Sequence, residues 1–310
     1  MENIYDMLIV GGGPGGYTAA LYAARAGLRV AVLEKLSAGG QMALTNEVDN
    51  YPGFENGIDG FDLAVKMETQ AQRFGAETIY AEVEDLELEG SVKKLVTSEG
   101  DFFAKTVAIA TGANPRKLDL PGEEKLSGRG IHYCAHCDGM RYRGKTVVVV
   151  GGGNTAAADA LTLSRLADKV IVIHRRDTLR ATKVYHKPLL QAENVEFIWN
   201  STVSDLLSDG KLTGITVKNL LTGEERELSC DGVFVSIGRA PATGLVEGKL
   251  QLDAGGYIVA GENTATGAAG VFAVGDVRTK ELRQIVTAVA DGAHAAHEAE
   301  KYLAENEHFW

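Results

Sequence analysis

The chain has 310 residues, 45% of them hydrophobic and 24% charged, which is typical of soluble globular proteins with ordinary apolar cores. Its 31 basic and 42 acidic residues give a formal net charge of −11, which disfavours non-specific binding to nucleic acid or to an anionic membrane. The apolar run near the N-terminus is short and preceded by acids, unlike a signal peptide or a membrane span. We therefore expect a cytoplasmic protein of about two domains that binds neither nucleic acid nor membrane.

A glycine-rich turn follows the first apolar strand. This strand leads directly into Gly-Gly-Gly-Pro-Gly-Gly at 11–16, and a helix-like segment and a second apolar strand come next. Gly11 permits the tight turn, Gly13 lets backbone amides approach a pyrophosphate, and Gly16 lets the helix lie close on the sheet. Glu34 stands 23 residues after Gly11, at the end of the second strand, where a carboxylate can bind a ribose diol. This context predicts a site for FAD or NAD, in preference to a purely structural turn.

A second strand, turn, helix and strand begin 140 residues later, with Gly151, Gly153 and Ala156 at the corresponding positions. Parallel strands joined by a helix build the sheet of a nucleotide-binding domain. Two such units in one chain therefore predict two nucleotide-binding domains.

The end of the second unit differs from the first in charge. His174 stands 23 residues after Gly151, in the register that Glu34 fills in the first unit, and Arg175 and Arg176 follow it, with Arg180 near. Replacing a carboxylate with cations is the change needed to accept the extra phosphate of NADP. We therefore expect NADP at the second unit; the alternative is a solvated basic edge after a strand.

Both units close with an apolar strand that ends at glycine and leads into a turn containing proline, which is typical of domain linkers. The segment after 244 is too short for a third domain, so we expect it to complete the first. The predicted fold is α/β, with two Rossmann-like domains of three-layer ββα architecture and the second domain inserted into the first. The expected boundaries are 1–114 and 245–310 for the first domain and 115–244 for the second.

Cys134 and Cys137 form a Cys-x-x-Cys motif, whereas Cys230 lies far away in sequence, at the start of an apolar strand. The spacing suits a reversible disulfide with a lowered thiol pKa. We favour this interpretation over zinc, because a structural zinc site needs four ligands. Asp138 directly follows the motif, where it can exchange a proton with a departing thiolate or simply form an Asp-Gly turn. Cys230 is interpreted as a core residue.

The motifs GGGPGG, GGQM, NEVDNYPG, ATGA, CAHCDG, GGGNTA, HRRD, GRAP, GVFAVGDV and RQI occur along essentially the whole chain. Their order resembles that of low-molecular-weight, bacterial-type thioredoxin reductases. The resemblance implies a homodimeric flavoprotein in which an NADPH domain, carrying the cysteine pair, interrupts an FAD domain. Electrons would pass from NADPH through FAD to Cys134 and Cys137 and on to the disulfide of thioredoxin or a thioredoxin-like protein. In this family Cys137 would face the flavin, Cys134 would attack the partner, and Asp138 would serve as the acid.

Carried over by position, the resemblance implies two sets of cofactor contacts and no metal site. FAD would contact Gly11, Gly13, Pro14, Gly15, Gly16, Glu34, Lys35, Gly40, Gln41, Asn50, Val83, Thr111, Gly112, Gly275, Asp276, Arg283, Gln284 and Ile285. NADPH would contact Gly151, Gly153, Asn154, Thr155, His174, Arg175, Arg176, Arg180, Ile237 and Arg239.

Three features depart from the family pattern. His136 replaces a small or apolar residue between the cysteines, and Met140 and Arg141 stand where bulky aromatics often help to dock thioredoxin. Ala158 and Asp159 stand where an acidic pair is common. A charged His136 would stabilise a nearby thiolate, whereas a neutral one would only fill the loop, and the sequence leaves both open.

Other functions remain as alternatives. A flavin reductase that serves ferredoxin should lack the cationic cluster of the second unit, and a peroxidase-linked reductase generally carries an extra N-terminal thioredoxin-like domain. A flavin-bound redox sensor is disfavoured by the cysteine pair with its adjacent acid. The sequence does not identify the natural partner.

Overall fold

The computed structural model describes residues 4–45 and 47–306. These residues fall into two compact units. The first comprises the described parts of Met1–Asn114 and Ala240–Trp310, and the second comprises Pro115–Arg239. The second unit is thus inserted into the first.

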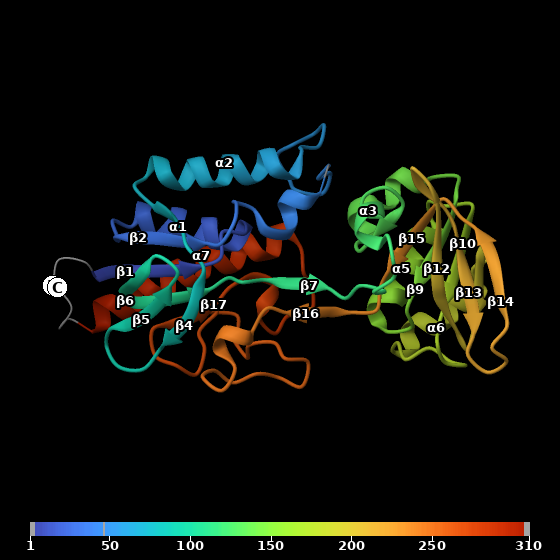
Figure 1. The fold of residues 1–310 in the computed structure, drawn as a ribbon. Helices are drawn as coiled ribbons and strands as arrows, with labels where there is room; N and C mark the ends of the chain where they lie inside the picture. Colours follow the sequence, from blue (N-terminus) through green and yellow to red (C-terminus); the bar gives the residue numbers. More distant parts are fainter. Residues whose placement is uncertain (1–3, 46, 307–310) are drawn as a thin grey trace. The chain divides into compact units, whose positions relative to one another are not determined.

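Two linker segments join the units. Their short strands, β7 (Ala113–Pro115) and β16 (Arg239–Pro241), pair with each other (Figure 1). The sequence predicted a return to the first domain at residue 245, and the compact units divide at Ala240. The return comes earlier because the segment after β15 pairs at once with the outgoing linker.

The first unit is built on a sheet with the strand order β3-β2-β1-β6-β5-β4, and β17 also pairs with β6. β6 is parallel to β1 and β17 but antiparallel to β5, so it belongs to two layers. Met7 and Ile9 of β1 pack on the helices, whereas Leu8 and Val10 pack toward β4 and β5. This alternation gives the ββα layers. The strands are β1 (Ile4–Val10), β2 (Val30–Glu34), β3 (Glu77–Tyr80), β4 (Val83–Glu87), β5 (Lys93–Thr97), β6 (Gly100–Ile109) and β17 (Val271–Ala273).

The helices of the first unit pack through small residues. α1 contacts both α2 and α7 (Figure 1). A side chain on Gly292 of α7 would overlap the carbonyl of Gly15, so glycine permits the close approach of α7 to the start of α1. The helices and short 3₁₀ turns are α1 (Pro14–Arg25), η1 (Gly40–Leu44), α2 (Gly60–Arg73), η3 (Gly244–Val246), η4 (Gly275–Val277) and α7 (Ile285–Glu305).

The second unit repeats this architecture. Its parallel sheet has the order β11-β10-β9-β15-β8, and β12, β13 and β14 form a separate antiparallel sheet. Val147 and Val149 of β9 pack on the helices, whereas Val148 and Val150 pack on the antiparallel sheet. The strands are β8 (Ile131–His132), β9 (Thr146–Val150), β10 (Lys169–Ile173), β11 (Val195–Ile198), β12 (Ser201–Asp209), β13 (Lys211–Asn219), β14 (Glu225–Ser229) and β15 (Gly232–Val235). The helical segments are α3 (Glu123–Leu126), α4 (Ala135–Asp138), η2 (Gly139–Tyr142), α5 (Asn154–Ser164) and α6 (Lys183–Gln191).

Among the helices of residues 4–45 and 47–306, none has the length and apolar character that crossing a membrane requires.

Candidate functional site

The first glycine turn connects β1 to α1. Gly11 has φ +107°, and a Cβ on it would overlap the carbonyl of Ala110, so only glycine fits this turn. Gly13 precedes α1, and among the described residues no side chain caps this helix and none lies within 4 Å of a Cβ placed on Gly13. Pro14, Gly15 and Gly16 form the first turn of α1. The N–H groups at this helix end are therefore open to an anion.

Glu34 ends β2 beside this turn. Its Oε2 accepts a hydrogen bond from the N–H of Gly12 at 2.7 Å, and its Oε1 accepts one from Leu36 at 3.1 Å. The N–H of Gly39 donates to the carbonyl of Gly12 at 2.7 Å, which ties the start of η1 to the same turn. The structure therefore brings the glycine turn, Glu34 and Gly40 together.

A second group of the expected FAD residues gathers at the start of α7. Gln284 caps this helix through reciprocal bonds with Thr287, and its side-chain oxygen accepts from Asn50 Nδ2 at 2.9 Å. Arg283 Nε donates to the carbonyl of Asp276 in η4 at 3.4 Å. Ile285 opens α7.

The remaining residues of the expected FAD set lie around this region with other partners. Lys35 is exposed and pairs with Glu82 at 2.5 Å, next to Val83 at the start of β4. Gln41 Nε2 donates to Asn114 at 2.9 Å, and Thr111 Oγ1 donates to the carbonyl of Ala242 at 2.7 Å. Gly112, at φ +73°, follows Thr111.

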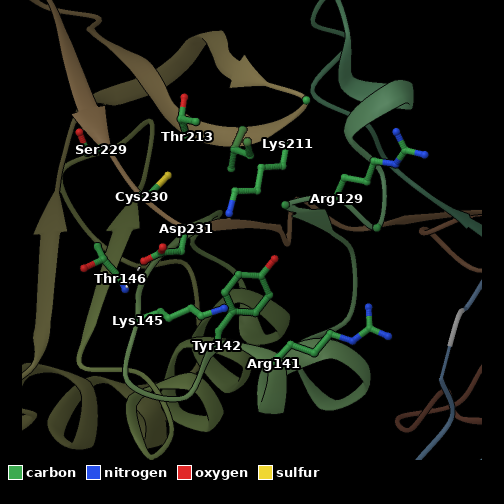
Figure 2. A pocket seen from close by; sticks show the side chains of 14 residues that line it. Arg129, Arg141, Tyr142, Lys145, Thr146, Lys211, Thr213, Ser229, Cys230 and Asp231 are labelled. Carbon is green, nitrogen blue, oxygen red and sulfur yellow. Dashed lines mark hydrogen bonds between the residues drawn. The ribbon is translucent and has the colours of Figure 1, made fainter.

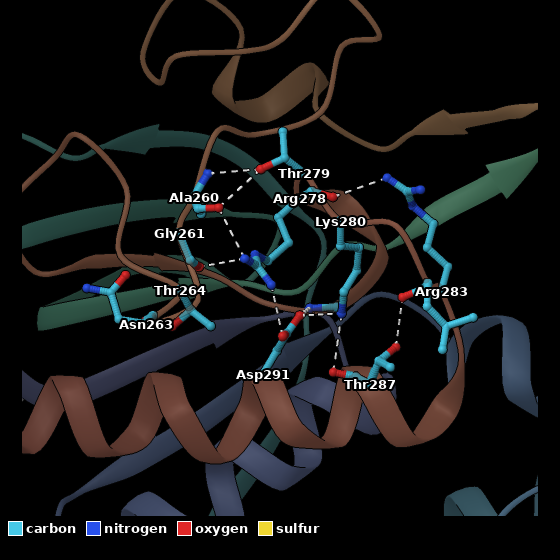
Figure 3. Close-up of polar contacts among 12 residues, drawn as sticks. Ala260, Gly261, Asn263, Thr264, Arg278, Thr279, Lys280, Arg283, Thr287 and Asp291 are labelled. Carbon is cyan, nitrogen blue, oxygen red and sulfur yellow. Dashed lines mark hydrogen bonds and ion pairs between the residues drawn. The ribbon is translucent and has the colours of Figure 1, made fainter. Parts of the chain in front are cut away.

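A buried charged cluster that the sequence did not reveal fixes the Gly275 turn (Figure 3). Asp291 of α7 accepts from the N–H of Gly275 at 2.9 Å, from Arg278 at 2.9 Å and from Lys280 at 2.6 Å. Arg278 also donates to the carbonyls of Ala260 and Gly261. The one available signal was an aspartate within a helix of small and apolar residues.

The second glycine turn connects β9 to α5. Gly151 has φ +147°, and a Cβ on it would overlap the carbonyl of Ser236. Gly153 precedes α5, and among the described residues nothing lies within 4 Å of a Cβ placed there. Asn154 and Thr155 open α5, and Asn154 Oδ1 accepts from the N–H of Thr182 at 2.8 Å.

His174 follows β10 and is buried against this turn, so closely that a side chain on Gly152 would overlap its ring. Its Nε2 has no hydrogen-bond partner within the described part of the chain. Burial, and then the charges of Arg176 and Arg175, lower the pKa of His174. Both arginines are exposed, as is Arg180, whose N–H donates to the carbonyl of Gly152 at 2.7 Å. β15 ends at Val235, and Ser236 and Ile237 follow it. Arg239 begins β16.

Cys134 and Cys137 form a disulfide, with their Cα atoms 5.3 Å apart. Cys134 precedes α4 and Cys137 lies within it, and both side chains are partly exposed. Among the described residues, no three His, Cys, Asp or Glu side chains gather where they could hold a metal ion. The closed disulfide between Cys134 and Cys137 fits a redox-active pair.

Asp138 ends α4 and faces a buried histidine. His132 Nδ1 lies 3.2 Å from Asp138 Oδ2, and His132 Nε2 lies 2.6 Å from the hydroxyl of Tyr142. Arg141 lies 3.8 Å from Asp138 Oδ1. The sequence does not relate His132 to Asp138 or Tyr142, because β8, α4 and η2 come together only in the fold.

Asp159 of α5 is a buried carboxyl close to the cysteine motif. It accepts from Ser236 Oγ at 2.6 Å and from the backbone N–H of Ala135. Burial raises its pKa, although these hydrogen bonds and the charges of His136 and Arg239 act in the opposite direction.

A pocket of about 740 Å³ opens on the same unit (Figure 2). Cys230 lines it but is itself 6% exposed, and burial raises the pKa of its thiol to about 12. This thiol stays protonated near neutral pH, as expected for a core residue rather than a redox centre. The charged side chains on the pocket wall are Arg129, Arg141, Lys145, Lys211 and Asp231.

Comparison with known proteins assigns the family. The pyridine nucleotide-disulphide oxidoreductase family matches residues 5–292. The thioredoxin reductases of Peptoclostridium acidaminophilum and Treponema pallidum are 44% and 46% identical, covering 99% and 98% of this chain and the same shares of their own. The crystal structure of thioredoxin reductase from Streptococcus pyogenes has a TM-score of 0.91 at 42% identity, covering 98% of this chain and 100% of that chain. The predicted resemblance and fold class are confirmed. The chain belongs to the pyridine nucleotide-disulphide oxidoreductase family and, within it, to the low-molecular-weight thioredoxin reductases.

Proposed function

We propose that the chain is an NADPH-dependent thioredoxin-disulfide reductase that sends electrons through FAD to Cys134 and Cys137 and on to thioredoxin or a thioredoxin-like protein. The observation that carries this proposal is the disulfide between the two cysteines, in the same unit as a dinucleotide turn with a cationic edge. In the overall reaction NADPH, one proton and a protein disulfide give NADP⁺ and a protein dithiol, so two electrons move and the atoms balance.

The first unit fits FAD. Three features match a pyrophosphate with its ribose: open space above Gly13, the start of α1, which no described side chain caps, and the Glu34 carboxylate. Gln284, Asn50 and the Gly275–Asp276 turn would hold the flavin end, and we assign the other expected FAD residues of this unit to the same cofactor.

The second unit fits NADPH. The open space at Gly153 would take the pyrophosphate, and Nε2 of His174, which has no partner among the described residues, would donate to a bound 2′-phosphate. Arg175, Arg176 and Arg180 would supply positive charge. We accordingly propose that the first unit is the FAD domain and that the second is the NADPH domain.

Cys134, Cys137 and Asp138 would each carry out a different step of the disulfide exchange. FAD, when bound, accepts a hydride from NADPH and supplies two electrons to the disulfide. Cys137 would face the flavin and Cys134 would attack the partner disulfide, and Asp138 would protonate the thiolate released when the enzyme disulfide opens. Its position at the end of α4, directly after Cys137, supports this role.

The partner and the assembly are further proposals. The relatives are named thioredoxin reductase, which supports a thioredoxin-type protein as the electron acceptor. We also propose a homodimer in the cytoplasm, and family resemblance is the support for both.

Cysteine variants test the function. In Cys134→Ser and in Cys137→Ser, NADPH should still bleach the flavin, because hydride transfer does not need the disulfide, while thioredoxin reduction should fall to background. Stopped-flow absorbance and an NADPH-coupled thioredoxin assay measure the two steps. Substantial thioredoxin turnover in either variant would defeat the exchange mechanism, and stoichiometric zinc in the purified protein would favour a metal site.

A further inference from the structure

Asp138, His132 and Tyr142 form a row of neighbouring polar groups, referred to here as the polar row. His132 Nδ1 lies 3.2 Å from Asp138 Oδ2, and its Nε2 lies 2.6 Å from the hydroxyl of Tyr142. The side chain of His132 is 2% exposed and that of Asp138 is 18% exposed, and Tyr142 is buried. The proposed function gives no role to His132 or Tyr142.

The partners of His132 allow a tautomer that carries its proton on Nδ1. Burial, followed by the negative charge of Asp138, raises the pKa of Tyr142 to about 12, so its hydroxyl keeps its proton and can donate to Nε2. A neutral imidazole that accepts at Nε2 carries its proton on Nδ1. In this tautomer Nδ1 carries the hydrogen nearest to Asp138 Oδ2, and the two atoms lie 3.2 Å apart. Donors and acceptors thus alternate without conflict from Tyr142 to Asp138.

Ring packing holds the imidazole in this orientation. His132 stacks on Phe234 of β15 with ring centres 5.3 Å apart, and the edge of Tyr142 meets it at 5.2 Å. Tyr142 also packs edge-on against Phe234. Rotation of the imidazole would break the hydrogen bond to Tyr142, the contact with Asp138 and both ring contacts.

Four groups of the described residues lie near this polar row: Arg141, Lys145, Asp231 and Cys230. Arg141 approaches the other oxygen of Asp138, Oδ1, at 3.8 Å. Tyr142 lines the pocket of Figure 2, where the ammonium of Lys145 lies 5.3 Å from its ring centre. Asp231 and Cys230 also act on the Tyr142 hydroxyl. Oδ2 of Asp138 is thus engaged by His132, while Oδ1 lies toward Arg141.

We propose that His132, oriented by Tyr142, is a positioning residue for the acid: it occupies Oδ2 of Asp138 as a hydrogen-bond donor, so the transferable proton sits on Oδ1. This inference rests on the proposed function. When two electrons enter the disulfide, its S–S bond breaks, one sulfur takes the proton from Asp138 Oδ1, and the other remains a thiolate. Asp138 is left as a carboxylate, which the Nδ1–H of His132 stabilises.

The test is the pH profile of thioredoxin reduction by the holoenzyme, with NADPH and a purified bacterial thioredoxin. In His132→Ala we expect kcat to fall about tenfold, a fraction of what a general acid contributes, with KM for thioredoxin unchanged. The descending alkaline limb should move to higher pH, because loss of a donor to the carboxylate favours the protonated acid. His132→Asn, whose amide can still donate to Oδ2, should restore most of the rate. An equal loss at every pH, or no rescue by asparagine, would mean that His132 only fills the core.

Tyr142→Phe guards against a folding failure in His132→Ala, because it keeps both ring contacts and removes only the hydroxyl. It should reproduce the shift of the alkaline limb in weaker form. Tyr133→Phe is the matched control. Tyr133 directly precedes Cys134, and its hydroxyl donates to Glu123 at 2.8 Å, so it takes no part in the polar row of Asp138, His132 and Tyr142. Its pH profile should equal that of the wild type. A shift in Tyr133→Phe as large as that in Tyr142→Phe would overturn the inference.

Two further measurements separate this inference from the proposed function. In ¹⁵N-histidine spectra the wild type should show the Nδ1–H tautomer of His132, and an Nε2–H tautomer would overturn the inference without reference to activity. Asp138→Asn should lose most turnover. Full turnover in Asp138→Asn would show that Asp138 is not the acid of the proposed function. If Asp138→Asn loses turnover but His132→Ala keeps the pH profile of the wild type, only the role of His132 is overturned.

Discussion

The imidazole of His174 lies against Gly152 as the carboxylate of Glu34 lies against Gly12. In the first unit Glu34 accepts the N–H of Gly12 at 2.7 Å. In the second unit the ring of His174 fills the corresponding space, and a side chain on Gly152 would overlap it. A carboxylate at this place would repel a 2′-phosphate, whereas an imidazole flanked by guanidinium groups attracts one.

The first prediction concerns nucleotide preference. Arg175 and Arg176 are exposed beside His174. We expect Arg175→Ala with Arg176→Ala to reduce the preference for NADPH over NADH by about 10- to 100-fold for each arginine that contacts the 2′-phosphate, since one charge-assisted contact is worth about 1.5–3 kcal/mol. The ratio of kcat/KM for the two nucleotides measures it. Arg226→Ala, an exposed arginine on β14, is the control. An unchanged ratio in the double variant would contradict the NADPH assignment.

The nucleotide turns could be predicted from sequence because their signal is local. A strand, a glycine turn and a helix follow one another directly, and the register comparison between Glu34 and His174 needs no tertiary information. The cysteine pair is equally local, and the structure closes it as a disulfide.

The supporting residues could not be predicted because their partners are distant in sequence or on other elements. Ser236 reaches Asp159 across 77 residues. Asp291 meets the Gly275 turn only because α7 packs beneath it. Strand periodicity does predict burial, but it does not state which polar group a buried side chain meets.

The second prediction concerns the Asp291 cluster. Asp291→Asn leaves Arg278 and Lys280, which are 8% and 9% exposed, without their shared counter-ion. Breaking such a buried pair costs about 3–5 kcal/mol, and the asparagine oxygen keeps one acceptor, so we expect a loss near 3 kcal/mol. Urea unfolding and the FAD content of the purified protein measure it.

The control for this prediction is Asp85→Asn, which removes the partner of Lys249 in a more exposed ion pair. We expect little change in stability and normal FAD content, because exposed pairs contribute little. Equal effects of Asp85→Asn and Asp291→Asn would contradict a special role for the buried cluster.

The third prediction follows from Asp159, whose pKa burial raises. A carboxyl with a raised folded-state pKa contributes stability that is fully present below the unfolded value of about 3.9 and is lost as the pH rises through the folded-state value. Asp159→Asn cannot ionise. We therefore expect the free energy of unfolding of the variant to increase relative to that of the wild type as the pH rises from 4 to 8. Urea unfolding at each pH measures it. The same pH dependence in both proteins would contradict a buried Asp159 with a raised pKa.

The last prediction concerns His136, which is exposed between the two cysteines and whose charge acts on Asp159. An imidazole gains charge as the pH falls, and a cation beside the pair stabilises the thiolate form and raises the reduction potential. We therefore expect His136→Thr to lower the potential of the cysteine pair, and the difference from wild type to grow from pH 8 to pH 6. Each ~30 mV corresponds to about 1.4 kcal/mol, or tenfold in the equilibrium constant.

This difference bears on the natural partner. A thioredoxin has a reduction potential of about −270 mV. Electron transfer to it becomes less favourable as the reductase's own cysteine pair becomes more oxidising, although excess NADPH offsets part of this loss. A charged His136 therefore favours a partner that is more oxidising than an ordinary thioredoxin. Equilibration of each protein with NADPH and NADP⁺ from pH 6 to pH 8 gives both potentials. Equal potentials for wild type and His136→Thr at every pH would show that His136 only shapes the loop, and the redox argument for an unusual partner would fall with it.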